Sequence, residues 1–84
     1  MIGPLARELA PRRVNAVSPG VVDTAWWDKF PVDVKTDLFR QQAETLPVGR
    51  VGHAEDVAHA LQFLMENTFM TGAVIECGGG LRLL

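Results

Sequence analysis

The chain has 84 residues and a formal net charge of −2, and 48% of its residues are hydrophobic. A chain of this length removes only about 60–65% of its unfolded surface from water. The weak charge and the short apolar runs argue against nucleic acid or a membrane as a partner. One cysteine cannot form an intramolecular disulfide, and no Cys/His cluster has metal-site spacing. The free thiol and the lack of a secretory signal predict a cytoplasmic location.

The first ten residues predict a short amphipathic helix. Their apolar positions recur at helical spacing, and Pro11 closes the segment. Because the residue before a proline avoids the helical region, we expect the helix to begin at Pro4, which suits a first turn. The apolar positions are Ile2, Leu5, Ala6 and Leu9.

Val14–Val17 is short, apolar and partly β-branched, which is typical of a buried parallel strand. Ser18-Pro19-Gly20 is expected to end it, because proline has no backbone N–H and glycine suits turns. Val21–Thr24 would then follow the carboxyl end of the strand, where open α/β sheets bind ligands. The sequence therefore places any ligand site in this segment.

Two further helices are expected between residues 24 and 46. Thr24 can cap a short helix that runs to Phe30, and Pro31 ends it. Asp33 can cap a second helix reaching about Leu46. The second helix is expected to turn Val34, Leu38 and Phe39 inward.

The last part of the chain predicts a helix and a second strand. After a turn-rich connector at residues 47–52, Glu55 and Asp56 place negative charge at the positive end of a helix that runs to Glu66-Asn67. Ala73–Cys77 reads as a strand, followed by Gly78-Gly79-Gly80 and a tail. Strand, helical crossover and strand predict a parallel βαβ unit of two strands and about three to four helices. Two parallel strands are not stable alone, so the pattern implies further strands. The apolar stripe of the helix is Val57, Ala60, Leu61 and Leu64.

Three segments in this order resemble the C-terminal third of the short-chain dehydrogenase/reductase family, Rossmann-fold oxidoreductases that use NAD or NADP. The resemblance covers nearly the whole chain. The segments are Leu9-Ala10-Pro11 with Arg13–Gly20, then Gly49–Ala58, then Thr71–Gly79.

The resemblance implies that residues 1–84 form the C-terminal fragment of one NAD(P)-binding domain, at the end of a doubly wound parallel α/β sheet. It implies hydride transfer between the nicotinamide and a small-molecule alcohol or carbonyl substrate. Residues 21–46 would form the substrate-binding loop and lid. It also implies a homo-oligomer, either a dimer or a tetramer.

The family pattern implies cofactor contacts at four positions. Pro19 and Gly20 would lie against the nicotinamide, the Val22 backbone would pair with its carboxamide, and the Thr24 hydroxyl would reach the carboxamide or nearby phosphate oxygens. A strand-end backbone offers a fixed donor and acceptor, which a neutral amide needs.

Other parts of the family pattern are missing from the chain. It contains no tyrosine, so it has no Tyr-x-x-x-Lys pair, and it lacks the catalytic serine and the glycine-rich phosphate turn. Gly78-Gly79-Gly80 follows a strand, and no helix is expected after it to receive a pyrophosphate. Cys77 stands where members often have aspartate. We therefore expect weak or no cofactor binding and no catalysis by this chain alone.

Several residues keep two interpretations. The Thr24 hydroxyl can cap a helix or contact cofactor, and Trp26, Trp27 and Phe30 can line a substrate pocket or cover the strand ends. Structural roles are favoured for the remaining polar residues. These are Asn15 as a backbone bridge, His53 and His59 on a helix surface, Cys77 as a small buried hydrophobe, and Arg12-Arg13 in a solvated turn with one local pairing.

The preferred prediction is therefore a segment of an NAD(P)-dependent oxidoreductase that supplies part of the nicotinamide pocket, the lid and oligomer contacts. The alternative is a truncated, non-catalytic remnant that acts as a self-associating or subunit-interaction module. The high apolar content of so short a chain motivates the alternative.

Overall fold

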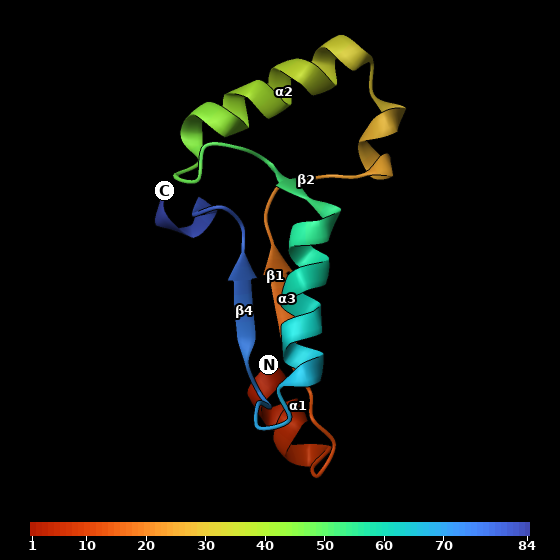
Figure 1. The fold of residues 1–84 in the computed structure, drawn as a ribbon, viewed down its shortest axis with the longest axis vertical. Coiled ribbons are helices and arrows are strands. Elements are labelled where there is room, and N and C mark those ends of the chain that lie inside the picture. The colour runs from red at the N-terminus through yellow and green to blue at the C-terminus, as the bar shows by residue number, and fades with distance from the viewer.

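The computed structural model describes residues 1–84, which form helices and short parallel sheets (Figure 1). The α-helices, the 3-10 helices (η) and the strands follow one another in a βαβ order. They are α1 (Ile2–Glu8), β1 (Ala16–Pro19), β2 (Val22–Asp23), η1 (Ala25–Lys29), α2 (Val32–Thr45), β3 (Gly52–His53), α3 (Ala54–Glu66), β4 (Val74–Cys77) and η2 (Leu81–Leu83).

β1 and β4 pair in parallel, which confirms the predicted α/β unit. The strand runs through Pro19, so the prediction that it spans Val14–Val17 was two residues early. The N–H groups of Ala16 and Gly20 donate to Ala73 (2.9 Å) and Cys77 (3.2 Å) of the β4 side. The backbone nitrogens of the residues in between, among them Pro19, therefore face the other edge of β1. The absence of an N–H on Pro19 thus removes no hydrogen bond to β4.

Side chains extend this pairing before β1 begins. The Asn15 amide donates to the Met70 carbonyl at 2.9 Å and accepts from the Ala73 N–H at 3.0 Å. The Val14 N–H donates to the Thr71 hydroxyl at 3.1 Å. The structural role expected for Asn15 is confirmed, and these bonds replace ladder bonds where the strand has not yet formed.

α1 begins at Ile2, so the expected start at Pro4 was wrong. Pro4 lies in the first turn, where no earlier helical carbonyl exists for its ring to strike. The preference of the preceding Gly3 for extended backbone is overridden there. Of the predicted stripe only Ala6 is fully buried.

Residues 24–46 form η1 and α2, with different caps from those expected. Thr24 holds the N-cap position of η1 but its hydroxyl makes no capping bond. Pro31 is the N-cap of α2, and Asp33 lies inside the first turn, so the predicted Asp33 cap was wrong. Val34 is exposed rather than inward, because α2 arches away from the β1–β4 sheet (Figure 1).

Two short features were not predicted. β2 and β3 pair in parallel, with Val22 opposite Gly52 and Asp23 opposite His53. Two-residue strands are too short to show any hydrophobic period. The segment after the glycines, expected as a tail, forms the three-residue η2.

Arg13 makes long-range bonds, so the expected local pairing was wrong. Its guanidinium donates to the carbonyls of Leu64 (2.9 Å), Met65 (3.2 Å), Asn67 (3.0 Å) and Met70 (3.3 Å). The final carbonyls of a helix have no intrahelical partner and carry negative partial charge. Arg13 therefore ties the end of α3 to the segment that leads into β1.

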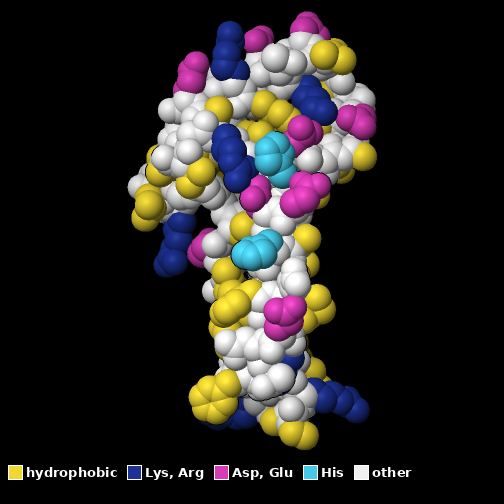
Figure 2. Space-filling view, viewed as in Figure 1, with side chains coloured by type: hydrophobic (Ala, Val, Ile, Leu, Met, Phe, Trp, Pro, Cys, Tyr) yellow, Lys and Arg dark blue, Asp and Glu magenta, His cyan; other side chains and the backbone are white.

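Little of the chain is buried. Only Ala6, Leu46 and Leu64 are fully buried, and the accessible surface is 6206 Å². A compact 9.2 kDa protein exposes about 4,900 Å². The radius of gyration is 15.5 Å, against about 12 Å for a compact chain of this length. Figure 2 shows hydrophobic side chains spread over the visible face. None of the helices is both long and apolar enough to cross a membrane.

Candidate functional site

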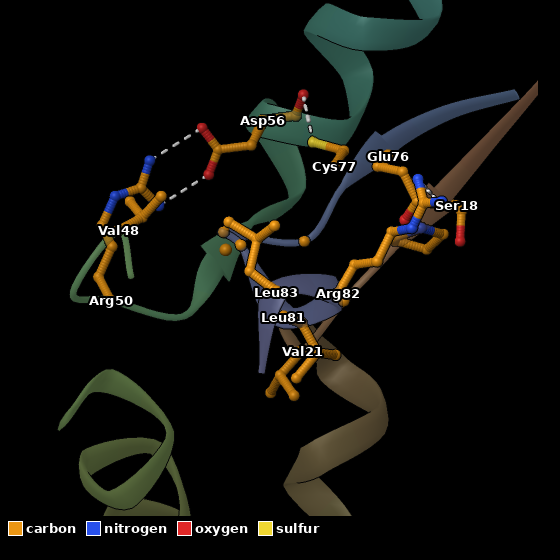
Figure 3. A pocket seen from close by; sticks show the side chains of 16 residues that line it. Ser18, Val21, Val48, Arg50, Asp56, Glu76, Cys77, Leu81, Arg82 and Leu83 are labelled. Carbon is orange, nitrogen blue, oxygen red and sulfur yellow. Dashed lines mark hydrogen bonds and ion pairs between the residues drawn. The ribbon is translucent and has the colours of Figure 1, made fainter. Parts of the chain in front are cut away.

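A hollow of about 590 Å³ lies at the carboxyl ends of β1 and β4 (Figure 3). Pro19 and Gly20 line it, at the end of a parallel strand, which is where open α/β sheets bind ligands. Glycines, apolar side chains and charged side chains make up the rest of its wall. The lining comes from residues 18–21, 76–83, Val48, Arg50, Gly52 and Asp56.

Gly20 and Gly78 bring the two strand ends into close backbone contact. A Cβ placed on Gly20 would lie 2.8 Å from the Gly78 Cα and 3.1 Å from its carbonyl oxygen. Neither atom belongs to a flexible side chain, so nothing could move aside cheaply. The floor of the hollow therefore needs glycine at position 20.

The charged residues of the hollow are paired with one another. Arg50 binds the Asp56 carboxylate through two N–H groups, at 2.8 and 3.1 Å, and Arg82 lies 3.9 Å from Glu76. Figure 3 shows the two pairs on opposite sides of Leu81 and Leu83. The hollow thus offers a backbone surface and paired charges.

Asp56 is fixed at the start of α3. The Arg50 guanidinium, and then the His53 N–H at 2.7 Å, hold the pKa of the Asp56 carboxyl well below its usual range. The same pairing raises the pKa of Arg50. Asp56 was expected only as a helix-dipole charge; its spacing from Arg50 fits no regular period, so the pair was missed.

We expect Asp56→Asn to flatten the acid sensitivity of the fold. A carboxyl whose folded pKa lies below its unfolded value of about 3.9 stabilises the fold above that pH. This contribution disappears as the pH falls through the folded pKa. Urea midpoints measured from pH 6 to pH 2 should therefore fall less in Asp56→Asn than in the wild type. Asp37→Asn, which breaks the exposed pair with Arg40, should retain the wild-type slope.

The other predicted site residues lie outside the hollow, around β2 and η1. Trp27 meets Trp26 edge-on at 4.8 Å and Phe39 at 5.4 Å between ring centroids. Phe30 lies 5.6 Å from both tryptophans. We call Trp26, Trp27, Phe30 and Phe39 the aromatic cluster. Sequence reasoning placed Phe39 inward on its helix but did not connect it to this group.

A hydrogen bond joins the cluster to β2. The Trp27 indole N–H donates to the Val22 carbonyl at 2.9 Å. Lys35 of α2 makes a second link, with its Nζ 3.3 Å from both Asp23 and Asp28. Desolvation lowers the pKa of Lys35, but its bonds to the two carboxylates outweigh this and leave the pKa raised. The segment after Gly20 is thereby tied to η1 and α2.

The structure thus divides the predicted site in two. Pro19 and Gly20 line the hollow, whereas Val22 and the aromatic side chains gather at β2 and η1. Thr24 lies between β2 and η1, is exposed, and its hydroxyl makes no capping bond. No group of three His, Cys, Asp or Glu side chains lies close enough to hold a metal ion.

Comparison with known proteins gives a consistent result over the whole chain. A family model described as enoyl-(acyl carrier protein) reductase matches residues 1–82. The chain is 40% identical over 83 residues to carbonyl reductase family member 4 of Danio rerio and to 3-oxoacyl-[acyl-carrier-protein] reductase of Homo sapiens. In both cases the match covers 95% of the chain and 32% of the relative. The chain therefore spans about a third of the length of these curated relatives.

Solved structures agree. A small-chain dehydrogenase in complex with NADPH superimposes with a TM-score of 0.94 at 42% identity, covering 99% of this chain and 38% of that one. The MalC reductase/Diels-Alderase of Malbranchea aurantiaca gives a TM-score of 0.87 at 31% identity, covering 99% and 32%.

Proposed function

The chain belongs to the short-chain dehydrogenase/reductase family, and we propose that it supplies one wall of a nicotinamide pocket, together with the lid over the substrate. In this proposal residues 1–84 act as the C-terminal part of a single NAD(P)-binding domain. The observation that carries it is the position of the Pro19–Thr24 segment at the carboxyl end of β1, in a chain that matches the family from residue 1 to residue 82.

Within this wall, Pro19 and Gly20 lie against the nicotinamide, Val22 pairs its backbone with the carboxamide, and Thr24 offers its hydroxyl. Support comes from the exposed, uncapped Thr24 and from the backbone contact that fixes Gly20. NADPH is one candidate cofactor, since a solved structural neighbour was crystallised with it. NAD remains the other, as expected from the family.

The reaction proposed for the complete site is hydride transfer between the nicotinamide and a small-molecule alcohol or carbonyl substrate. In the reductive direction the bound cofactor would supply a hydride to the carbonyl carbon, and a general acid would supply a proton to the carbonyl oxygen. The family resemblance implies a tyrosine as the general acid, and this chain contains none, so the proposal assigns the general acid to a part of the domain outside these 84 residues. Trp26, Trp27 and Phe30, on the 21–46 segment, form an apolar cover suited to a bulky or apolar substrate.

A chimera tests this proposal. The chain would replace the matching segment of the 3-oxoacyl-[acyl-carrier-protein] reductase of Thermotoga maritima, which is 40% identical over 80 residues. We expect the chimera to oxidise NADPH with a 3-oxoacyl substrate, while the 84-residue chain alone does not. A folded chimera without activity, or turnover by the isolated chain, would overturn the proposal.

The same chimera tests Thr24. Thr24→Val removes the hydroxyl and should raise the KM for NADPH by about fivefold, the effect of one hydrogen bond. Thr36→Val, the same change on the exposed face of α2, should leave the KM unchanged. Equal effects of the two substitutions would exclude a cofactor contact at Thr24.

A second candidate function is association through the uncovered surface. The open edge of β1 and the small number of buried residues favour it, since exposed edges and apolar area are the features that partners cover. Sedimentation should then show a concentration-dependent dimer or tetramer of the chain. A well-folded monomer at all concentrations would count against this function.

A further inference from the structure

Trp27 differs from its neighbour Trp26 in that its indole N–H makes a hydrogen bond to the backbone. Its indole N–H donates to the Val22 carbonyl at 2.9 Å, while Trp26 is 56% exposed and holds Lys29 over its ring at 3.8 Å. Both indoles belong to the same aromatic cluster. Only Trp27 couples that cluster to the backbone of β2.

The proposed function pairs the Val22 backbone with the nicotinamide carboxamide, and in that pairing the Val22 carbonyl is the group that can accept the amide N–H. A carbonyl oxygen has two lone pairs, so it can accept the indole N–H and one amide N–H together. A bond already made to one lone pair fixes the direction of the other, because the peptide plane can no longer rotate freely. Trp27 thus sets the orientation of the acceptor before the cofactor arrives.

We infer that Trp27 is a positioning residue whose indole N–H holds the Val22 carbonyl toward the carboxamide and links cofactor binding to the aromatic cluster of the lid. This inference rests on the proposed function. The cluster spans η1 and α2, through Trp27 and Phe39. Binding of the carboxamide would therefore alter the packing of the aromatic cluster in the segment that covers the substrate.

The test compares NADP⁺ with its 3-acetylpyridine analogue, in which a methyl group replaces the amide nitrogen. The analogue cannot donate to Val22. Binding to the chimera described above, carrying either the wild-type segment or a variant of it, is followed by saturation-transfer NMR. The wild type should prefer NADP⁺ by about fivefold, the effect of one hydrogen bond.

Trp27→Phe keeps an aromatic ring and removes the N–H. It should bring the ratio of the affinity for NADP⁺ to the affinity for the analogue close to one, while the affinity for the analogue stays unchanged. A purely structural role would instead lower both affinities equally. Trp26→Phe is the matched control, the same change at an indole without the bond to Val22, and it should retain the fivefold preference.

The possible failures are distinguishable. If the wild type binds both nucleotides equally, or neither, the proposed Val22 contact is wrong, and the inference falls with it. If the wild type prefers NADP⁺ and Trp27→Phe retains that preference, only the inference about Trp27 is wrong.

A measurement on the wild type alone covers the case in which Trp27→Phe does not fold. The Trp27 indole proton should exchange with water more slowly than that of Trp26, and its resonance should shift on addition of NADP⁺ but not of the analogue. Equal exchange of the two indole protons would overturn the inference.

Discussion

Replacing Arg13 with alanine should lower the free energy of unfolding by about 2 kcal/mol. The guanidinium donates to four carbonyls at the end of α3 and just beyond it. Bonds from a charged donor are stronger than neutral ones, although exposure of most of them to water weakens each. In a chain with so small a core, such a loss is a large fraction of the total stability.

Arg12→Ala provides the matched control, because Arg12 is exposed and its side chain makes no hydrogen bond or ion pair. It should change the urea midpoint very little. Arg13→Lys should rescue only part of the loss, since an ammonium cannot reproduce the planar fork of the guanidinium. If both alanine variants unfold at the same urea concentration, Arg13 does not anchor α3.

Replacing Gly20 with alanine should cost about 3 kcal/mol, the upper range for forcing extra volume into a packed site. The new Cβ would lie 2.8 Å from the Gly78 Cα, so the ends of β1 and β4 must separate. Amide hydrogen exchange should then lose protection at Gly20, whose N–H donates to the Cys77 carbonyl at 3.2 Å. In the chimera the same substitution should abolish NADPH-dependent activity.

Gly3→Ala is the comparison, because nothing lies within 4 Å of a Cβ at that position. Alanine in a helical turn should leave the stability unchanged or raise it by about 0.5 kcal/mol. A Gly20→Ala chain as stable as the wild type would show that the two strand ends can adjust, and that the hollow does not require glycine there.

The main elements could be predicted from the sequence because each has a strong local signal. The apolar stripe of α3, with Glu55 and Asp56 at its start, and the β-branched runs near β1 and β4 gave the parallel βαβ order. Boundaries were less predictable. Pro19 remains in β1 because its nitrogen, which carries no hydrogen, faces the edge opposite β4. Which edge it faces depends on the strand pairing and not on the local preference of proline.

The candidate site was predictable where it depends on a strand end and not where it depends on tertiary contacts. Pro19 and Gly20 line the hollow at the end of β1, and their contact with a cofactor stays a prediction. The bonds from Arg13 to α3 and from Trp27 to Val22, and the Arg50–Asp56 pair, join residues at spacings that no helix or strand period marks. These contacts appear only once the chain has folded.

The bridge between Asn15 and Ala73, 58 positions apart in the chain, has a consequence for how the protein is made. At roughly 5–20 residues per second of synthesis, β1 emerges roughly 3–12 s before the strand that pairs with it. Parallel pairing over such a separation is slow to form, because closing the loop loses entropy before any contact is gained. The edge of β1 that pairs with β4 therefore stays unpaired for seconds. During that interval chaperone capture and aggregation compete with folding.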